Sequence, residues 1–526
     1  MAEITGAGIT GLAAYLPRLR LSRKAIADAH AWADPALRAR ARGHRSMCNW
    51  DEDPVTMAVE AARNCLSQSE YHRRSDTSAD TRQSGNGMTD AIYFASTSAP
   101  FADRQHAGIV STALSLGEDI ASVDIGFSQR AGTSALIQAL GSVAGGVYAS
   151  ALVVASDKRR TKAASPGELS YGDGAIALSV GRTNTLLDIL AVESATVDFI
   201  DHFRAADQAF DYTWEERWIR DEGFAGIVPP VIERALKTAG LAADQIDHFV
   251  MPSSIGRAVS NIARKAGLKP ESVRDNLQSS CGETGTAHPM MMLLHTLETQ
   301  AEPGQYILMA GFGQGCDAIV FEVTSNWPQY RNARSNTLTE QLSHGIEETN
   351  YSKYLAFNDL VTLEKGMRAE RDDYKTALSV TYRKRDLLLG LMGGRCNQCG
   401  TLQFPRSDIC VNPQCHATHS QTPHSFRDEP AQILSWSADY LTYTADPPSH
   451  YGMITFDAGG RFMTDFTDLE PGEIEVGTRI KMMFRIKSID SQRGFVRYFW
   501  KGVPERVPER VSERIPERAS ESAGSV

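Results

Sequence analysis

The chain has 526 residues, of which 42% are hydrophobic and 22% charged, as in a soluble globular protein of several domains. Its net charge of −10 and pI near 5.8 argue against the basic surface that nucleic acids require. Because apolar runs are too short to span a membrane and the first residues do not resemble a signal peptide, we expect a cytoplasmic protein without a membrane or nucleic-acid partner.

The first half of the chain alternates buried strands with helices. Gly6 to Gly11 matches a dinucleotide-binding glycine pattern, but no full strand precedes it. We therefore interpret this stretch as part of a first buried strand that ends at Pro17, before a helix that Ser22 caps. The next predicted elements are a helix from Met57 to Cys65, a polar loop near residues 67–89, a strand from Ala91 to Ser96, a turn and helix from Asp124 to Leu140, a strand from Ala151 to Ser156, and a turn into a strand from Tyr171 to Val180.

The second half repeats this order. AGTSALIQAL in the first half matches TGTAHPMMML in the second, and GDGAIALSV matches GCDAIVFEV. Two such copies predict an internally duplicated α/β fold with a mixed sheet in each half. The predicted elements are a helix from Pro229 to Leu241, a strand from Ile246 to Pro252, a helix from Ser260 to Leu268, a helix after Ser280 to Pro289, a strand from Tyr306 to Ala310, the turn Gly311 to Gly315, and a strand from Asp317 to Val323.

These motifs resemble the thiolase superfamily, and within it the hydroxymethylglutaryl-CoA synthase branch. The GDGA turn, the GTAHP helix start and the GFGQG turn carry the resemblance in the family's order, over residues 3–325. The resemblance implies an αβαβα layered fold and a homodimer. It also implies an active site between the two halves that takes an acyl-CoA through a coenzyme A tunnel.

Three catalytic positions of that family carry other residues here. The resemblance puts the nucleophilic cysteine at Gln129 and the synthase glutamate at Thr97. The family's histidine would fall in the strand that contains Val250, Met251 and Pro252, none of which can replace it. We therefore expect no acyl-enzyme at residue 129.

The remaining catalytic candidates lie in the sequence SCGETGTAHP, from Ser280 to Pro289. His288 precedes Pro289 as in a thiolase G-H-P motif, and it is either an acid/base or a satisfied histidine at a helix start. Glu283 either orients His288 or is a simple helix N-terminal charge. Cys281 is either a displaced nucleophile or an inert buried thiol, and we favour the latter because buried thiols are common.

Chemistry next to a thioester needs oxyanion donors and an acid/base, but no nucleophile, if it proceeds through an enolate. The backbone of Gly311, Gly313 and Gly315 either supplies such donors or packs tightly at a strand end. We favour an aldol, retro-aldol or Claisen-type enzyme that acts on an acyl-CoA. The alternatives are an acyltransferase with a displaced nucleophile and a non-catalytic acyl-CoA-binding subunit.

A cysteine cluster is the most specific signal. Cys396, Cys399, Cys410 and Cys415 have the spacing of a four-thiolate zinc site, which is closed to water and therefore structural. The following residues alternate polar and apolar runs between Gly- or Pro-containing turns, as in a small antiparallel OB-type barrel. Ribbon and barrel together resemble the accessory family that helps thiolase-like enzymes to hold the coenzyme A part of an acyl-CoA.

The predicted domain organisation follows from these units. It comprises a thiolase-like domain over residues 1–328 with pseudo-repeats at about 1–185 and 186–328, a helical connector over 329–385, a zinc ribbon over 386–420, a barrel over 421–502 and a disordered repeat tail over 503–526.

Overall fold

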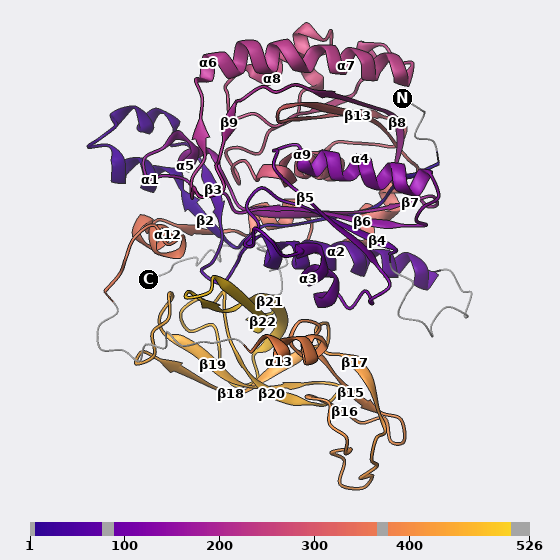
Figure 1. Cartoon of the computed structure of the whole chain (residues 1–526), viewed down its shortest axis with the longest axis vertical. Coiled ribbons are helices and arrows are strands. Elements are labelled where there is room, and N and C mark those ends of the chain that lie inside the picture. Colours follow the sequence, from indigo (N-terminus) through magenta and orange to yellow (C-terminus); the bar gives the residue numbers. More distant parts are fainter. Residues whose placement is uncertain (1–5, 76–88, 365–376, 507–526) are drawn as a thin grey trace, which may run out of the picture.

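The computed structural model describes residues 6–75, 89–364 and 377–506. Its larger part stacks helices and sheets in the order helix, sheet, helix, sheet, helix (Figure 1). The central layer holds two buried helices, α4 (Ala131–Ala144) and α9 (His288–Thr299). The outer layers hold α7 (Ala225–Ala239) and α8 (Ala258–Lys265) on one side, and α2 (Pro54–Ser75) and α3 (His106–Ala113) on the other.

The strands repeat one pairing pattern in both halves. In each half a parallel pair is extended by two antiparallel neighbours, and β1 and β8 join the halves into a nine-stranded sheet that ends at β5 (Ala121–Ile125). The first set is β4 (Ala91–Ala95), β6 (Ala151–Asp157), β7 (Gly174–Gly181) and β1 (Gly8–Tyr15). The second set is β11 (His248–Val250), β12 (Tyr306–Phe312), β13 (Gly315–Val323) and β8 (Leu187–Thr196). This repeat confirms the predicted duplicated α/β fold.

The two central helices lie close together at their N-terminal ends, where α4 carries a glycine. A Cβ on Gly132 would collide with the carbonyl oxygen of Thr286, so glycine lets the start of α4 lie against the turn before α9. Both helices are apolar around most of their circumference, as expected of helices covered by sheets on two sides.

Several boundaries differ from the predictions. The predicted polar loop does not begin near residue 67, because α2 continues to Ser75; residues 76–88 of that loop lie outside the described residues. Helix α7 begins at Ala225, so Pro229 and Pro230 lie inside it. The other elements of this part are β2 (Leu19–Ser22), α1 (Arg23–His30), a 3₁₀ helix (Pro35–Arg40), β3 (His44–Met47), α5 (Pro166–Ser170), β9 (His202–Phe203), β10 (Tyr212–Thr213), α6 (Glu216–Trp218), α10 (Trp327–Ala333), α11 (Leu338–Ser343), β14 (Ile346–Glu348) and α12 (Tyr351–Phe357).

The first part of the predicted connector packs against the layered domain. Trp327 and Tyr330 are buried, and the Tyr330 hydroxyl both donates to and accepts from the backbone of Leu12. Strand β14 pairs in parallel with β2. The predicted domain boundaries stay predictions.

The C-terminal part contains two antiparallel sheets. Two short helices, α13 (Leu378–Arg383) and α14 (Arg385–Leu388), lead into it. The ribbon is built from β15 (Met392–Cys396), β16 (Leu402–Gln403) and β17 (Gln421–Ser425). The second sheet contains β18 (Ala431–Asp439), β19 (Ser449–Phe456), β20 (Arg461–Asp465), β21 (Arg479–Asp490) and β22 (Phe495–Pro504). A Phe466–Gly502 bridge brings its two ends together, whereas OB-type topology stays a prediction. The predicted tail lies outside the described residues beyond 506.

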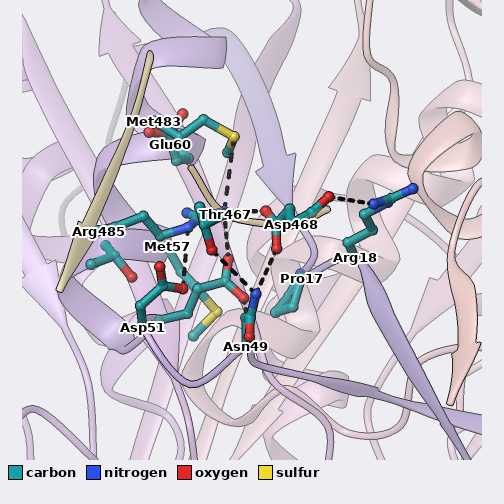
Figure 2. Close-up of polar contacts among 12 residues, drawn as sticks. Pro17, Arg18, Asn49, Asp51, Met57, Glu60, Thr467, Asp468, Met483 and Arg485 are labelled. Atoms are coloured by element: carbon teal, nitrogen blue, oxygen red, sulfur yellow. Dashed lines mark hydrogen bonds and ion pairs between the residues drawn. The ribbon is translucent and has the colours of Figure 1, made fainter. Parts of the chain in front are cut away.

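A buried charged cluster, here called the docking cluster, joins this sheet to the layered domain. It consists of Asp51, Glu52, Asp468, Arg485 and Lys501. Arg485 lies between Asp51 and Asp468 (Figure 2), and its Nη2 is 2.7 Å from Asp468 and 3.1 Å from Glu52. Lys501 Nζ is 2.8 Å from Asp51. Because single charges are costly to bury, these pairs require the two parts to meet in one register.

Candidate functional site

A cavity of about 510 Å³ opens between residues of the two halves. The first half contributes Gln129, just before α4, and Arg159, just after β6. The second half contributes Glu283, before α9, and Phe312, at the end of β12. The β9–β10 hairpin closes part of the wall with Tyr212 and other residues. A cavity of this size holds a drug-sized ligand, for which about 300–1,000 Å³ is usual.

Arg159 lies at the centre of a polar group in this wall. Its Nη2 donates to Asp211 at 2.6 Å and to the Tyr171 hydroxyl at 2.8 Å, and its Nη1 lies 3.4 Å from Glu283. The Gln129 amide also faces the guanidinium, and in the orientation that satisfies both groups its oxygen accepts from Nη1 at 3.1 Å. Arg159 therefore brings together four side chains that are distant in the sequence.

The titration of this group follows from burial and charge. Burial raises the pKa of the Tyr171 hydroxyl, although the Arg159 cation opposes the shift. Burial alone would raise the pKa of Asp211, but Arg159 and Arg204 outweigh it and hold that pKa below its usual value. Asp211 is thus anionic at neutral pH and balances the buried guanidinium.

A histidine–aspartate pair lines the same cavity. His202 Nδ1 is 2.9 Å from Asp201 Oδ2, and Nε2 lies 3.4 Å from the Gln129 amide. A carboxylate only accepts hydrogen bonds, so Nδ1 carries a proton. In the Gln129 orientation that suits Arg159, the amide oxygen is the atom that faces Nε2. Sequence reasoning missed this pair, because the only signal is an adjacent Asp-His in FIDHF, and neighbouring polar residues are common in loops.

Glu283 is the only one of the three predicted catalytic residues that lines the cavity. His288 is fully buried instead: Nδ1 accepts from the Thr284 N–H at 3.1 Å, and Nε2 donates to the Asn276 carbonyl at 2.9 Å. Burial lowers the pKa of His288, so its imidazole is neutral. With both nitrogens engaged by the backbone, this is the geometry of the satisfied helix-start histidine.

Cys281 and the predicted glycines are also not among the residues that line the cavity. Cys281 is fully buried, and burial raises the pKa of its thiol to about 12. A Cβ on Gly311 would meet Thr133, one on Gly313 would meet the Ser128 side chain, and one on Gly315 would meet the backbone of Ala195. These contacts fit the tight-packing alternative for the glycines.

A second cavity of about 380 Å³ shares Arg40 and neighbouring wall residues with the first, and we call it the vestibule. Arg23, Arg257 and Arg274 also line it. Burial, reinforced by repulsion from Arg45, lowers the pKa of Arg23 to about 10. Among the described residues, Arg23 Nε and Arg274 Nε are buried without a hydrogen-bond partner. The vestibule is therefore lined by four arginines and one acidic residue, Asp275, and its lining is basic overall.

The ribbon cysteines fit a metal. The ligand atoms of Cys396, Cys399, Cys410 and Cys415 all lie within 4.8 Å of one another. A tetrahedral zinc ion with Zn–S bonds of about 2.3 Å places its sulfurs about 3.8 Å apart. The sulfurs of Cys396 and Cys415 are 3.9 Å apart, and those of Cys399 and Cys410 are 3.6 Å apart. This donor set suits a structural zinc ion.

Two family models match the chain. Residues 236–322 match the C-terminal part of 3-oxoacyl-(acyl-carrier-protein) synthase III, and residues 390–419 match the ChsH2, rubredoxin-like zinc ribbon domain. The ribbon match contains all four cysteines and supports zinc as the bound metal. In the parts of the chain that the structure describes, no helix is long and apolar enough to cross a membrane.

Solved structures share the fold. A hydroxymethylglutaryl-CoA synthase complexed with CoA aligns with a TM-score of 0.56 and 18% identity, over 71% of this chain and 95% of that one. The 3-oxoacyl-(acyl carrier protein) synthase III of Pseudomonas aeruginosa aligns with a TM-score of 0.52 and 21% identity, over 61% and 98%. These likenesses confirm the predicted thiolase-like fold.

Curated relatives carry the family assignment. The hydroxymethylglutaryl-CoA synthase of Caldivirga maquilingensis is 28% identical over 373 residues, which cover 68% of this chain and 99% of the relative. That of Methanothermobacter thermautotrophicus is 30% identical over 324 residues, which cover 60% of this chain and 88% of the relative. The chain therefore belongs to the hydroxymethylglutaryl-CoA synthase family of thiolase-superfamily condensing enzymes.

Proposed function

We propose that the protein forms or breaks a carbon–carbon bond next to the thioester of an acyl-CoA, without an acyl-enzyme at residue 129. The observation that carries this proposal is the composition of the cavity wall. Gln129 occupies the expected nucleophile position, and among the described residues that line the cavity there is no cysteine. An amide cannot form the thioester intermediate that a cysteine forms.

The vestibule supports an acyl-CoA as the substrate. Coenzyme A carries phosphate groups, and Arg23, Arg40, Arg257 and Arg274 provide cations at the entrance to the cavity. The thioester would then reach into the larger cavity through the shared wall.

The chemistry that remains is stabilisation of an enolate. The Arg159 cation and the Gln129 amide lie at the same wall, where they can stabilise charge on a thioester oxygen. Glu283 contributes a carboxylate that is 16% exposed and either orients Arg159 or moves a proton. This set suits an aldol, retro-aldol or Claisen-type step.

A displaced nucleophile has less support. Cys281 is fully buried, and a thiol with a pKa near 12 is almost entirely protonated at neutral pH. The non-catalytic alternative has no observation in its favour, because charged groups and an ionisable pair line the cavity.

A homodimer in the cytoplasm is part of this proposal. The sheet ends at β5, an edge strand on which Val123 is exposed. Phe127, two residues beyond β5, is fully exposed and has a φ of 69°, which is strained for a bulky side chain. A second copy that pairs edge to edge would cover both residues. None of the eight cysteines, all of which lie in the described residues, forms a disulfide, which fits a reducing compartment.

Product analysis tests the proposal. The purified protein is incubated with saturated, 3-hydroxy and 3-oxo acyl-CoA thioesters of several chain lengths, alone and with aldehydes. Mass spectrometry should find CoA thioesters whose acyl groups have been lengthened or shortened by a carbon–carbon step. Hydrolysis to free acid and CoA as the only reaction, or no reaction with any member of the panel, would contradict it.

A further inference from the structure

We propose that His202, held by Asp201, is the acid/base of the cavity and that the substrate is a 3-hydroxyacyl-CoA whose hydroxyl faces His202 Nε2. The enzyme would cleave this substrate to a carbonyl compound and a shorter acyl-CoA. This inference rests on the proposed function and adds to it the substrate class, the direction of reaction and the group that moves the proton.

The imidazole of His202 is held in one orientation. Asp201 accepts from Nδ1 at 2.9 Å, which fixes the ring and leaves Nε2 on the side of the cavity, where it can exchange a proton with a ligand. Nε2 points to the Gln129 amide at the expected reaction centre. His202 and Asp201 retain 19% and 15% side-chain exposure, so the pair is sheltered but reachable from the cavity.

Another histidine–aspartate pair in the same chain, His106 and Asp124, differs from the cavity pair in the partner of Nε2. His106 Nδ1 is 2.8 Å from Asp124, much as in the cavity pair. There, however, Nε2 accepts from the Phe101 N–H at 3.2 Å, and neither residue lines the cavity. Both ring nitrogens of His106 are thus engaged within the protein, whereas His202 lines the cavity, where a ligand can reach it.

The charged groups around His202 favour transfer of a proton to and from its imidazole. The charged groups near His202 are Asp201, the residue before its strand, Asp211 from the loop beyond it, and two arginines that pair with Asp211, Arg159 and Arg204. Arg159 and Arg204 both pair with Asp211, so the charge of that carboxylate is already compensated. A transient imidazolium is then stabilised mainly by Asp201.

The side chains that line the cavity also indicate which substituent the acyl group carries. Tyr212, Trp214, Phe224 and Phe312 line the cavity, together with Ile219. An acetyl group would leave most of the 510 Å³ empty, whereas a bulky apolar substituent would cover these rings. We therefore expect an aromatic or alicyclic group on the carbon that bears the hydroxyl.

The step balances within the substrate. Nε2 takes the proton of the C3 hydroxyl, the C2–C3 bond breaks, and C3 becomes a carbonyl. The electron pair of that bond passes to the thioester as an enolate, whose oxygen faces Arg159 and Gln129. The imidazolium then returns its proton to C2. The products are one aldehyde or ketone and one shortened acyl-CoA, with no oxidant, reductant or added water.

The test uses 3-hydroxy-3-phenylpropanoyl-CoA, whose cleavage yields benzaldehyde and acetyl-CoA. The wild-type protein should release benzaldehyde. His202→Gln should lower kcat by about 10²–10⁴-fold with little change in KM, and the acid limb of the pH–rate profile should disappear. Asp201→Asn should show a smaller loss of kcat and a shifted acid limb. His106→Gln is the matched control and should keep the wild-type profile.

Different contrary outcomes would overturn different parts of the proposal. A His202→Gln protein with unchanged melting and kcat within about twofold of wild type would overturn the role of His202. If His202→Gln fails to fold, an Asp201→Asn protein with unchanged kcat and an unchanged pH profile would overturn that role instead. Carbon–carbon chemistry on other thioesters without benzaldehyde release would overturn the substrate class and leave the proposed function standing. Inactivity on the whole panel would overturn both.

Discussion

Two of the buried charge groups among the described residues, the docking cluster and the group around Arg159, differ in their surroundings. In the docking cluster, Arg485 and Asp51 are completely buried, and the side chain of Asp468 is only 6% exposed. In the group around Arg159, the arginine is equally buried, but its partners border a cavity of about 510 Å³. Buried charge thus holds the C-terminal five-stranded sheet against the layered domain in one place and lines a cavity in the other.

The consequences of losing a charge should differ accordingly. Removing one member of a closed, dehydrated ion cluster leaves its partners buried and uncompensated. Removing one member beside a cavity admits water or substrate to the remaining groups. The docking cluster should therefore control stability, and the cavity group should control chemistry.

The largest effect on stability should come from Arg485→Met. The substitution leaves Glu52, Asp51 and Asp468 with less compensating charge, so the free energy of unfolding should fall by about 3–5 kcal/mol. Urea unfolding of the whole chain measures it. Arg159→Met is the comparison and should lower kcat far more than stability. Equal losses of stability in the two variants would remove the distinction.

Loss of the ribbon metal should have the next largest effect. The wild-type protein should contain about one zinc per chain, and Cys396→Ser should lose it together with stability, because a structural zinc site contributes folding energy. Metal analysis and thermal unfolding measure the two quantities. Zinc-free protein that is folded and as stable as the zinc-containing form would refute a structural role.

A smaller effect should appear in the pH dependence of stability. Burial raises the pKa of Glu52 to about 7, above its value in the unfolded chain, with Asp468 adding to the shift and Arg485 opposing it. The folded protein then binds the extra proton, so the free energy of unfolding should fall by roughly 1–3 kcal/mol as the pH rises from about 4.5 to 7. Glu52→Gln should flatten this part of the curve in urea titrations. A Glu52→Gln curve parallel to that of the wild type would contradict the assignment.

The smallest effect should come from Cys281→Ala. Its thiol is buried and protonated, so kcat should stay within about twofold of wild type, with a modest loss of stability from the small cavity that forms. Steady-state rates on an active substrate measure this. Abolished activity in a folded variant would restore the displaced nucleophile.

The parts of the structure that could be predicted from the sequence are those with repeated motifs or a fixed residue spacing. The duplicated motifs identified the order of strands and helices, and the four cysteines identified the ribbon, because both signals are local. Glu283 was found because it lies in a glycine-rich turn. The role of His288 could not be judged, since the carbonyl of Asn276 that engages Nε2 is visible only in three dimensions.

The rest of the site could not be predicted for the same reason. Arg159 meets Gln129, Asp211 and Glu283 only after the two halves fold against each other. His202 lies on a two-residue strand, which is too short for a periodic pattern. The docking cluster pairs residues near position 51 with residues beyond 467, and no local rule relates them.

The central claim is that the cavity acts on an acyl-CoA without forming an acyl-enzyme. Intact-protein mass spectrometry during turnover, with rapid acid quenching over a series of times, tests it most directly. We expect the unmodified mass at every time point while product accumulates, in the wild type and in Gln129→Ala alike. An adduct with the mass of the acyl group, formed and lost at the rate of turnover, would contradict the account.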